Sequence, residues 1–154
     1  MEKIAIFPGT FDPFTVGHES VVNRAQGLFD KIFIAVGNNS SKDALFSLDE
    51  RKEFINQVFS GNLNIEVVHY EGLTIDFCKE VNANYILRGL RTSSDFEYER
   101  AIAQVNKSMY EDIETVFFLT MPEHTPINSS IVRDIIRHGG DVRNFIPTKM
   151  NIKK

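Results

Sequence analysis

The stretch Lys3–His18, KIAIFPGTFDPFTVGH, guides the interpretation of the whole sequence. Its residues 4–7 are all apolar and predict a short strand. A Pro-Gly pair ends that strand, and the glycine that precedes His18 leads into a helical pattern. Because the first N–H groups of a helix are unpaired and its dipole favours an anion, such a strand-to-helix turn commonly binds phosphate. Thr10 and His18 add side-chain donors, so the stretch predicts a phosphate-binding turn.

Composition is that of an ordinary folded protein and argues against several functions. The 154 residues fit one domain, 1–154, with 42% hydrophobic and 25% charged residues. A net charge of −4 gives no basic footprint for nucleic acid. The single cysteine, Cys78, excludes an internal disulfide or a cysteine-based zinc site, and its amphipathic surroundings favour a core position over a reactive thiol. No signal region opens the chain and no apolar run is as long as a membrane span, so we expect a cytoplasmic protein without membrane contact.

Short apolar runs alternate along the chain with apolar residues at helical spacing. The runs predict strands at residues 4–7, 31–36, 64–70, 85–87 and 115–120. The helical spacing predicts helices at about 18–28, from a Ser47–Glu50 capping box to Gly61, at 74–81, from Asp95 to Met109, and from Asn128 to Gly139. In the helix from Asp95, the residues on one face are Tyr98, Ala101, Ile102, Val105 and Met109. Five strands alternating with five helices predict an α/β fold, a single doubly wound, Rossmann-like domain with a five-stranded parallel sheet flanked by helices.

The ligand site of such a sheet lies at the carboxyl ends of the strands, where the strand order reverses. Residues with polar or cationic side chains collect at those ends: Thr10, His18, Lys42, Arg88, Arg91 and Asn128–Ser130. In an acidic protein, two arginines, a lysine and a histidine on one rim, together with hydroxyls, indicate a polyphosphate ligand.

Each of these residues also has a purely structural interpretation. His18 could cap a helix or lie at the surface, Lys42 could be a solvated loop residue, and the arginines could pair with carboxylates. Asn128–Ser130 could be only a helix cap, and Glu99 could lie on a solvated helix face. These interpretations require all the residues to share one edge by accident, so we favour the ligand site.

Several motifs carry a resemblance to a known family. Thr15–His18, TVGH, resembles the T/HxGH signature of the nucleotidyltransferase superfamily, and Gly9–Pro13 is similar to its small adenylyl- and cytidylyltransferases. Arg88–Arg91, RGLR, followed by Asp95–Glu99, DFEYE, resembles the bacterial phosphopantetheine adenylyltransferases. The resemblance runs from residue 2 to about residue 147, nearly the whole chain.

The resemblance implies an enzyme of coenzyme A synthesis that transfers the adenylyl group of ATP to 4'-phosphopantetheine, giving dephospho-CoA and pyrophosphate. By this resemblance, His18 contacts the α-phosphate, Thr10 orients the attacking phosphate, and Lys42 and Arg91 complete the catalytic set. The implied acceptor-binding positions are Thr10, Lys42, Thr74 and Arg88. The implied ATP-binding positions are Thr10, Phe11, Gly17, His18, Gly89, Leu90, Arg91, Glu99, His124, Thr125, Pro126, Ile127, Asn128, Ser129 and Ser130. It further implies Mg²⁺ held mainly by the ATP phosphates, a homohexamer, and inhibition by dephospho-CoA or CoA.

The residues suit this chemistry. A phosphate monoester is already an anionic nucleophile, so the site needs positioning and cations rather than a strong base. Of the acids, only Glu99 is expected near the rim. No activated serine or cysteine is evident, which favours direct in-line attack without a covalent intermediate. The last loop departs from the family, because His124 replaces an aromatic residue and Asn128 a serine. The first change weakens a stacking contact, whereas asparagine can still cap a helix.

Two other functions remain open. One is a related nucleotidyltransferase with another phosphate-bearing acceptor, such as nicotinamide mononucleotide or glycerol phosphate, which the RGLR–DFEYE pair argues against. The other is a catalytically silent nucleotide sensor, which the presence together of Thr10, His18, Lys42 and Arg91 argues against. RNA binding through the two arginines is disfavoured by the net charge and by the absence of exposed aromatic motifs.

Overall fold

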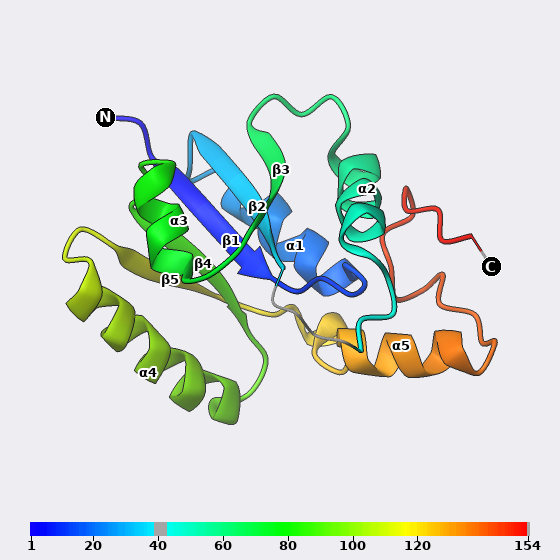
Figure 1. Ribbon diagram of the computed structural model, residues 1–154. Coiled ribbons are helices and arrows are strands. Elements are labelled where there is room, and N and C mark those ends of the chain that lie inside the picture. The colour runs from blue at the N-terminus through cyan, green and yellow to red at the C-terminus, as the bar shows by residue number, and fades with distance from the viewer. Residues whose placement is uncertain (39–42, 154) are drawn as a thin grey trace.

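The computed structural model describes residues 1–38 and 43–153. Strands and helices alternate along them (Figure 1). The strands are β1 (Ile4–Gly9), β2 (Lys31–Gly37), β3 (Ile65–Tyr70), β4 (Tyr85–Leu90) and β5 (Glu114–Leu119). The α-helices are α1 (Val16–Ala25), α2 (Leu48–Phe59), α3 (Thr74–Glu80), α4 (Ser93–Met109) and α5 (Ser129–Arg137), and a 3-10 turn, η1, covers Pro122–His124. Within these residues no helix is long and apolar enough to cross a membrane.

The strands form one parallel sheet in the order β3-β2-β1-β4-β5, which confirms the predicted fold class. The chain therefore builds outward from β1 to β3, then returns to place β4 on the other side of β1. Strand order reverses between β1 and β4, and this is where ligands bind in sheets of this kind.

The two strands at the reversal separate toward their carboxyl ends. β1 pairs with β2 along its whole length, up to Gly9 opposite Val36, but it pairs with β4 only at Ala5 and Ile6. Beyond that point Arg88 crosses the gap, and its Nη1 donates to the carbonyl oxygen of Pro8 at 2.8 Å. The divergence opens a crevice at the carboxyl edge of the sheet.

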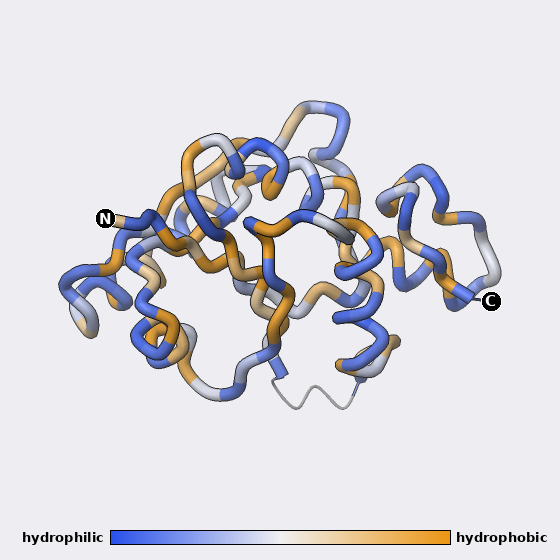
Figure 2. Tube along the Cα trace, turned by 90° about the horizontal axis from the view of Figure 1, so that it is seen from above, coloured by the Kyte–Doolittle hydropathy of each residue, from blue (hydrophilic) through white to orange (hydrophobic). Residues whose placement is uncertain are grey.

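Helices cover both faces of the sheet, as the unbroken apolar strands require. One face packs against α1, α2, α5 and the C-terminal segment, through residues such as Val22, Ile55 and Val132. The other face packs against α3, with Ile75 and Cys78 in the core. Cys78 is fully buried, as predicted, and burial raises the pKa of its thiol to about 12. Seen from above, the apolar segments gather in the middle of the molecule (Figure 2).

Several element boundaries differ from those predicted. β1 runs to Gly9, because Pro8 and Gly9 still pair with β2, so the Pro-Gly pair lies inside the strand instead of ending it. Three other differences reflect hydrogen bonds that apolar spacing does not reveal. α1 begins at Val16 rather than at residue 18, because Thr15 is its N-cap. β4 runs on to Leu90 rather than ending at residue 87, because all six of its residues pair with β5. α4 begins at Ser93 rather than Asp95, because Thr92 caps it. The predicted capping box of α2 is confirmed, since Ser47 and Glu50 exchange backbone-to-side-chain hydrogen bonds of 2.8 and 3.2 Å.

α4 is the exception to the packing rule. It has 17 residues, yet only Glu99 among them is buried, at 8% exposure. Glu99 therefore does not lie on a solvated face. The apolar side of α4 is exposed instead, with Tyr98 at 70% and Val105 at 57%. Figure 1 shows this helix at the outer edge of the molecule, farther from the sheet than α3.

The C-terminal segment, for which the sequence made no prediction, packs on the same face as α1 and α2. Val142, Ile146 and Met150 are buried in that core. The carbonyl oxygen of Phe145 accepts a hydrogen bond from the N–H of Val16 at 3.0 Å, so this segment also fixes the first turn of α1.

Candidate active site

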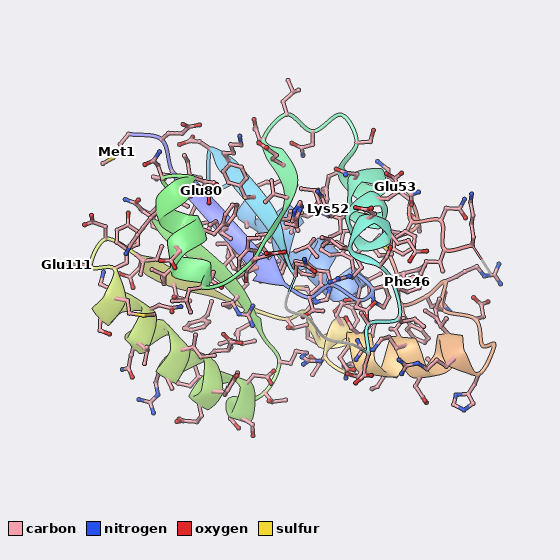
Figure 3. The ribbon with its side chains drawn as sticks, in the orientation of Figure 1. Met1, Phe46, Lys52, Glu53, Glu80 and Glu111 are labelled. Carbon is pink, nitrogen blue, oxygen red and sulfur yellow. The ribbon has the colours of Figure 1, made fainter. Side chains whose placement is uncertain are left out.

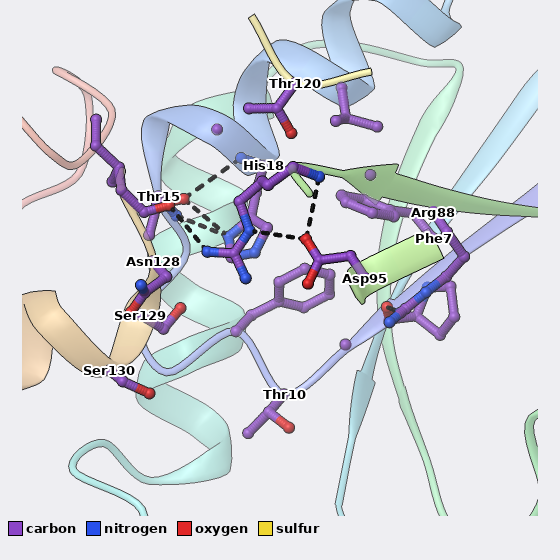
Figure 4. A pocket seen from close by; sticks show the side chains of 18 of the residues that line it. Phe7, Thr10, Thr15, His18, Arg88, Asp95, Thr120, Asn128, Ser129 and Ser130 are labelled. Atoms are coloured by element: carbon purple, nitrogen blue, oxygen red, sulfur yellow. Dashed lines mark hydrogen bonds and ion pairs between the residues drawn. The ribbon is translucent and has the colours of Figure 1, made fainter. Parts of the chain in front are cut away.

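The crevice at the strand reversal holds two adjoining pockets, of about 610 and 400 Å³. The first lies between β1, α1, β4 and the start of α5, and the second lies between the sheet and α4. Thr10, Arg88 and Glu99 line both pockets and therefore mark the boundary where they meet. Figure 4 shows His18 near the middle of the first pocket, with Asn128, Ser129 and Ser130 on one side and Arg88 on the other.

Most of the predicted site residues come together in this crevice. Those that line the first pocket are Thr10, Phe11, Gly17, His18, Arg88, Gly89, Arg91, Glu99, Ile127, Asn128, Ser129 and Ser130. Thr74 lines the second. Leu90, His124, Thr125 and Pro126 line neither pocket, and Lys42 lies outside the described residues. The roles assigned to all of these residues stay predictions.

His18 is the N3 residue of α1, and its ring takes part in capping the helix. The N–H of Thr15 donates to its Nδ1 at 3.0 Å, while the Thr15 hydroxyl accepts from the His18 N–H at 3.4 Å. Because Nδ1 accepts that bond, it carries no proton, and the neutral ring holds its proton on Nε2. The Nε2–H group is then the ring's donor to a ligand in the pocket.

Three aromatic rings surround His18. Phe11 meets it edge-on with ring centroids 5.0 Å apart, and Phe14 and Phe7 lie at 5.2 and 6.2 Å. Desolvation by these neighbours, with smaller contributions from the charges of Arg88 and Arg91, lowers the pKa of His18 to about 3. His18 is therefore a neutral donor at ordinary pH, which corrects the expectation that it adds a cation to the rim.

The N-terminus of α1 offers fewer free N–H groups than the sequence suggested. The N–H of Val16 is bound by Phe145 and that of His18 by Thr15. What α1 contributes to the pocket is mainly a side chain, the His18 ring. The expectation of a phosphate held by the backbone at this helix start is thus weakened.

Arg88 and Glu99 form a two-point ion pair at the boundary between the pockets. The Nε and Nη2 groups of Arg88 donate to Oε2 and Oε1 of Glu99 at 2.9 and 2.6 Å. Nη1 also donates to the carbonyl oxygen of Pro8, so each of the three guanidinium nitrogens makes one of these bonds. Nη1 and Nη2 each carry a second N–H, which these bonds do not use. Arg88 can therefore keep its place and still donate to a ligand from two directions.

Arg91 forms an ion pair with Asp95, the N3 residue of α4. Its Nε lies 3.5 Å from Oδ2 of Asp95, which also accepts from the backbone N–H groups of Arg91 and Thr92. The sequence interpretation expected Glu99 as the only acid near this rim, and Asp95 is a second one. Both carboxylates are engaged by arginines, so neither is free to act as a base.

The start of α5 forms the opposite wall. Asn128 is its N-cap, accepting from the N–H of Ile131 at 2.9 Å, as predicted for an asparagine in this position. Ser129 and Ser130 then occupy the first turn, where backbone N–H groups favour an anion. Ser129 donates its hydroxyl proton to the carbonyl of Pro13 at 2.8 Å, which locks this wall to the turn after β1.

His124 lies beside α1 rather than over the pocket. Its Cβ is 3.9 Å from the position that a Cβ on Gly17 would take. Its Nδ1 is buried and has no hydrogen-bond partner among the described residues. The side chain of His124 therefore starts beside Gly17 and does not line the larger pocket.

The second pocket contains most of the residues that the sequence interpretation missed. Its lining includes Tyr70 at the end of β3 and, from α4, Tyr98, Ile102 and Asn106. The three α4 residues follow an i, i+4, i+8 spacing, which places them on one side of a helix. That spacing was visible in the sequence, but nothing there showed that the side faces a ligand cavity rather than a core.

Comparison with known proteins agrees with these motifs. Residues 6–135 match the cytidylyltransferase-like family. The phosphopantetheine adenylyltransferase of Flavobacterium johnsoniae is 51% identical over 150 residues, covering 97% of this chain and 98% of its own. The enzymes of that name from Cytophaga hutchinsonii and Bacteroides thetaiotaomicron are 49% and 47% identical, covering 97% and 96% of this chain and 100% and 97% of their own.

The chain belongs to the phosphopantetheine adenylyltransferase family. The family resemblance drawn from TVGH, RGLR and DFEYE is thereby confirmed. A crystal structure of a Vibrio parahaemolyticus protein assigned as a nicotinate-nucleotide adenylyltransferase superposes with a TM-score of 0.72, over 97% of this chain and 96% of that one. At 20% identity this likeness supports the fold alone.

Proposed function

We propose that this chain transfers the adenylyl group of ATP to 4'-phosphopantetheine, giving dephospho-CoA and pyrophosphate in coenzyme A synthesis. The observation that carries the proposal is the pair of pockets meeting at Thr10 and Arg88, with the donor ring of His18 in the larger one. Two substrates can then lie end to end, with their reacting phosphates at the boundary. Membership of the phosphopantetheine adenylyltransferase family supplies the identity of those substrates.

The larger pocket suits the nucleotide. In the proposed reaction, a phosphate oxygen of the acceptor attacks the α-phosphorus of ATP, and the bond from that phosphorus to the bridging oxygen of the β-phosphate breaks. His18 donates its Nε2–H to the α-phosphate, where negative charge accumulates. Arg91 and the first turn of α5 bind the pyrophosphate that leaves. Thr10, exposed at the boundary, orients the attacking phosphate, and Lys42 stays a predicted contact for it.

The smaller pocket suits a pantetheine arm. Ile86, Ile102 and Ala103 give it apolar surface, and Thr74, Tyr70 and Asn106 give it hydroxyl and amide groups. A pantetheine chain likewise alternates methyl and methylene groups with amides, so each type of wall has a matching part. This proposal also explains why α4 stands away from the sheet, since the space between them is the acceptor pocket.

Magnesium is proposed to enter with ATP. Across the described part of the chain, no group of three or more His, Cys, Asp or Glu side chains could hold a metal ion. The two acids of the larger pocket, Asp95 and Glu99, are paired with arginines. These residues fit an ion that would be held by phosphate oxygens and water, as Mg²⁺ usually is in nucleotide sites, and that would neutralise phosphate charge.

We also propose that the enzyme acts in the cytoplasm as a homohexamer. Leu73 and Leu119, which line neither pocket, are 57% and 73% exposed, which supports contact with other copies. Light scattering of the purified protein tests this, because a monomer at working concentration would contradict it. Inhibition by dephospho-CoA or CoA is proposed for the same active site.

The decisive experiment follows pyrophosphate release from ATP and Mg²⁺ with a panel of acceptors. We expect release with 4'-phosphopantetheine and none with nicotinamide mononucleotide or glycerol phosphate. Release with one of those two acceptors instead would identify a related transferase. ATP binding by calorimetry without release for any acceptor would identify a nucleotide sensor. Either outcome overturns the proposal.

A further inference from the structure

Arg51 on α2 is a buried arginine that donates to backbone carbonyl oxygens. It is 5% exposed. Its Nη1 donates to the carbonyl oxygens of Thr10 at 2.8 Å and Gly37 at 3.4 Å, and its Nε donates to that of Ser47 at 3.4 Å. Among residues 1–38 and 43–153, no carboxylate forms an ion pair with it. One guanidinium thus joins the ends of β1 and β2 to the start of α2.

Burying a guanidinium in this way is costly unless its donors are satisfied, so the arrangement calls for a reason. Arginine presents its N–H groups in a rigid plane, which lets one side chain hold several carbonyls in fixed relative positions. The bond to Thr10 fixes the peptide between Thr10 and Phe11. Phe11 has a φ of 51°, a left-handed conformation that a bulky residue rarely adopts. The bond therefore helps to hold the turn that places the Phe11 ring against His18.

Asp12 makes a second link between the same two segments. It is 3% exposed, and its carboxylate accepts hydrogen bonds from the N–H groups of Leu45 and Phe46, both at 2.9 Å. Figure 3 shows Phe46 at the foot of α2, where the loop after β2 ends. Arg133 of α5 donates to the Asp12 carbonyl at 2.8 Å. Gly37 at the end of β2 is thus linked to the turn after β1 through Arg51, and Leu45 and Phe46 are linked to it through Asp12.

We infer that Arg51 and Asp12 are positioning residues that join the turn after β1 to the end of β2 and to the residues just before α2. Neither residue lines the two pockets. They act through Thr10, which lies where the two pockets meet. The expected change in kcat and KM rests on the proposed function. The expected change in amide exchange rests on the hydrogen bonds alone.

The kinetic test replaces Arg51 by lysine, which keeps the charge but loses the planar fork. We expect kcat to fall by about 100-fold and the KM for 4'-phosphopantetheine to rise, with the KM for ATP nearly unchanged, because misplacing Thr10 by about 1 Å disturbs the attacking group first. Arg143→Lys is the matched control, since that arginine is 86% exposed and lies outside both pockets. A folded Arg51→Lys enzyme with wild-type kinetics, or with kcat lowered only in proportion to its folded fraction, would overturn the inference.

Hydrogen exchange tests the same links without any assay of activity. In Arg51→Lys, we expect the amides of Leu45 and Phe46 to exchange about tenfold faster, although Arg51 does not touch them, while amides of β5 stay protected. Asp12→Asn should speed the same two amides and raise the same KM. If Leu45 and Phe46 keep wild-type exchange in Arg51→Lys, the two segments are independent and the inference fails. Wild-type protein inactive with 4'-phosphopantetheine would refute the proposed function but leave this exchange test standing.

Discussion

Helices α1 and α4 begin in the same way and then differ in everything they bury. Each starts after a threonine cap whose partner is the N3 side chain, His18 in α1 and Asp95 in α4. Both N3 residues line the larger pocket. Beyond the first turn, α1 buries Val21, Val22 and Ala25 against the sheet, whereas α4 buries only Glu99.

The difference shows how one fold can separate two tasks. α1 is packed on one side by the sheet core and at its start by the C-terminal segment, so it holds His18 in one place. α4 is separated from the sheet by the smaller pocket, so its inner side is available to a ligand. The first helix provides geometry for the chemistry, and the second provides a surface for binding.

The largest expected effect comes from exchanging the N3 residue of α1. Glutamine can complete a capping box, so His18→Gln should fold normally. Without the Nε2–H donor, turnover should fall by about 100- to 1,000-fold, because the developing charge on the α-phosphate loses a fixed hydrogen bond. ATP binding, measured by calorimetry, should change by less than about threefold.

Asp95→Asn is the matched change at N3 of α4. It keeps a cap acceptor and removes only the charge opposite Arg91, so we expect a loss of turnover below about tenfold. Equal losses of turnover for His18→Gln and Asp95→Asn would show that the two N3 residues contribute equally to catalysis, and that His18 has been given the wrong role.

The next effect concerns stability and compares the two helix bodies. Val22→Ala on α1 should lower the free energy of unfolding by about 2 kcal/mol, because Val22 is fully buried and the change leaves a cavity. Val105→Ala on α4 should lower it by less than about 0.5 kcal/mol, because Val105 is 57% exposed. Urea unfolding of both variants measures this. A similar loss at Val105 would mean that this side chain is covered in solution, and would remove the contrast between the helices.

Much of this architecture was predictable because it depends on local rules. Apolar runs and capping residues gave the elements, and parallel strands bring their carboxyl ends to one edge. This is why Thr10, His18 and Arg91, far apart in the sequence, line one pocket. The prediction needed only the order of the elements, not their packing.

The parts that could not be predicted depend on tertiary burial. Glu99 was expected at the ligand site, with a solvated helix face as the alternative, and nothing in the sequence showed that it is buried in an ion pair with Arg88. His18 looked like a cation until three phenylalanine rings were found around it. Arg51 lies among charged residues in DERKEF and reads as a surface residue, yet it is buried against carbonyls of two strand ends. In each case the neighbours come from other elements, so no local pattern reveals them.

A smaller effect is expected at the inner side of α4. Ile102→Ala should raise the KM for 4'-phosphopantetheine by about tenfold, because it removes apolar surface from the smaller pocket. The KM for ATP and the unfolding temperature should stay near wild type. Met109→Ala is the control, since Met109 lies on the exposed apolar side of α4 but lines neither pocket. Equal kinetic effects of the two substitutions would place the acceptor elsewhere.

The smallest effect is a pH dependence of the free energy of unfolding. It tests whether the His18 ring on α1 is shielded from water, in contrast to the exposed side chains of α4. The folded pKa of His18 is about 3, below its ordinary value of 6.5, so the ring stays neutral in the folded protein while it gains a proton in the unfolded chain as pH falls. Its contribution to stability is therefore complete above about pH 6.5 and is lost progressively between there and pH 3. Between pH 7.5 and 6, the wild type should lose about 0.8 kcal/mol of unfolding free energy more than His18→Gln loses. In the same range kcat should show no inflection from His18, because the Nε2–H donor form persists. An inflection near pH 6.5 that disappears in His18→Gln would show that the ring is solvated, and that the aromatic residues around it do not isolate it from water.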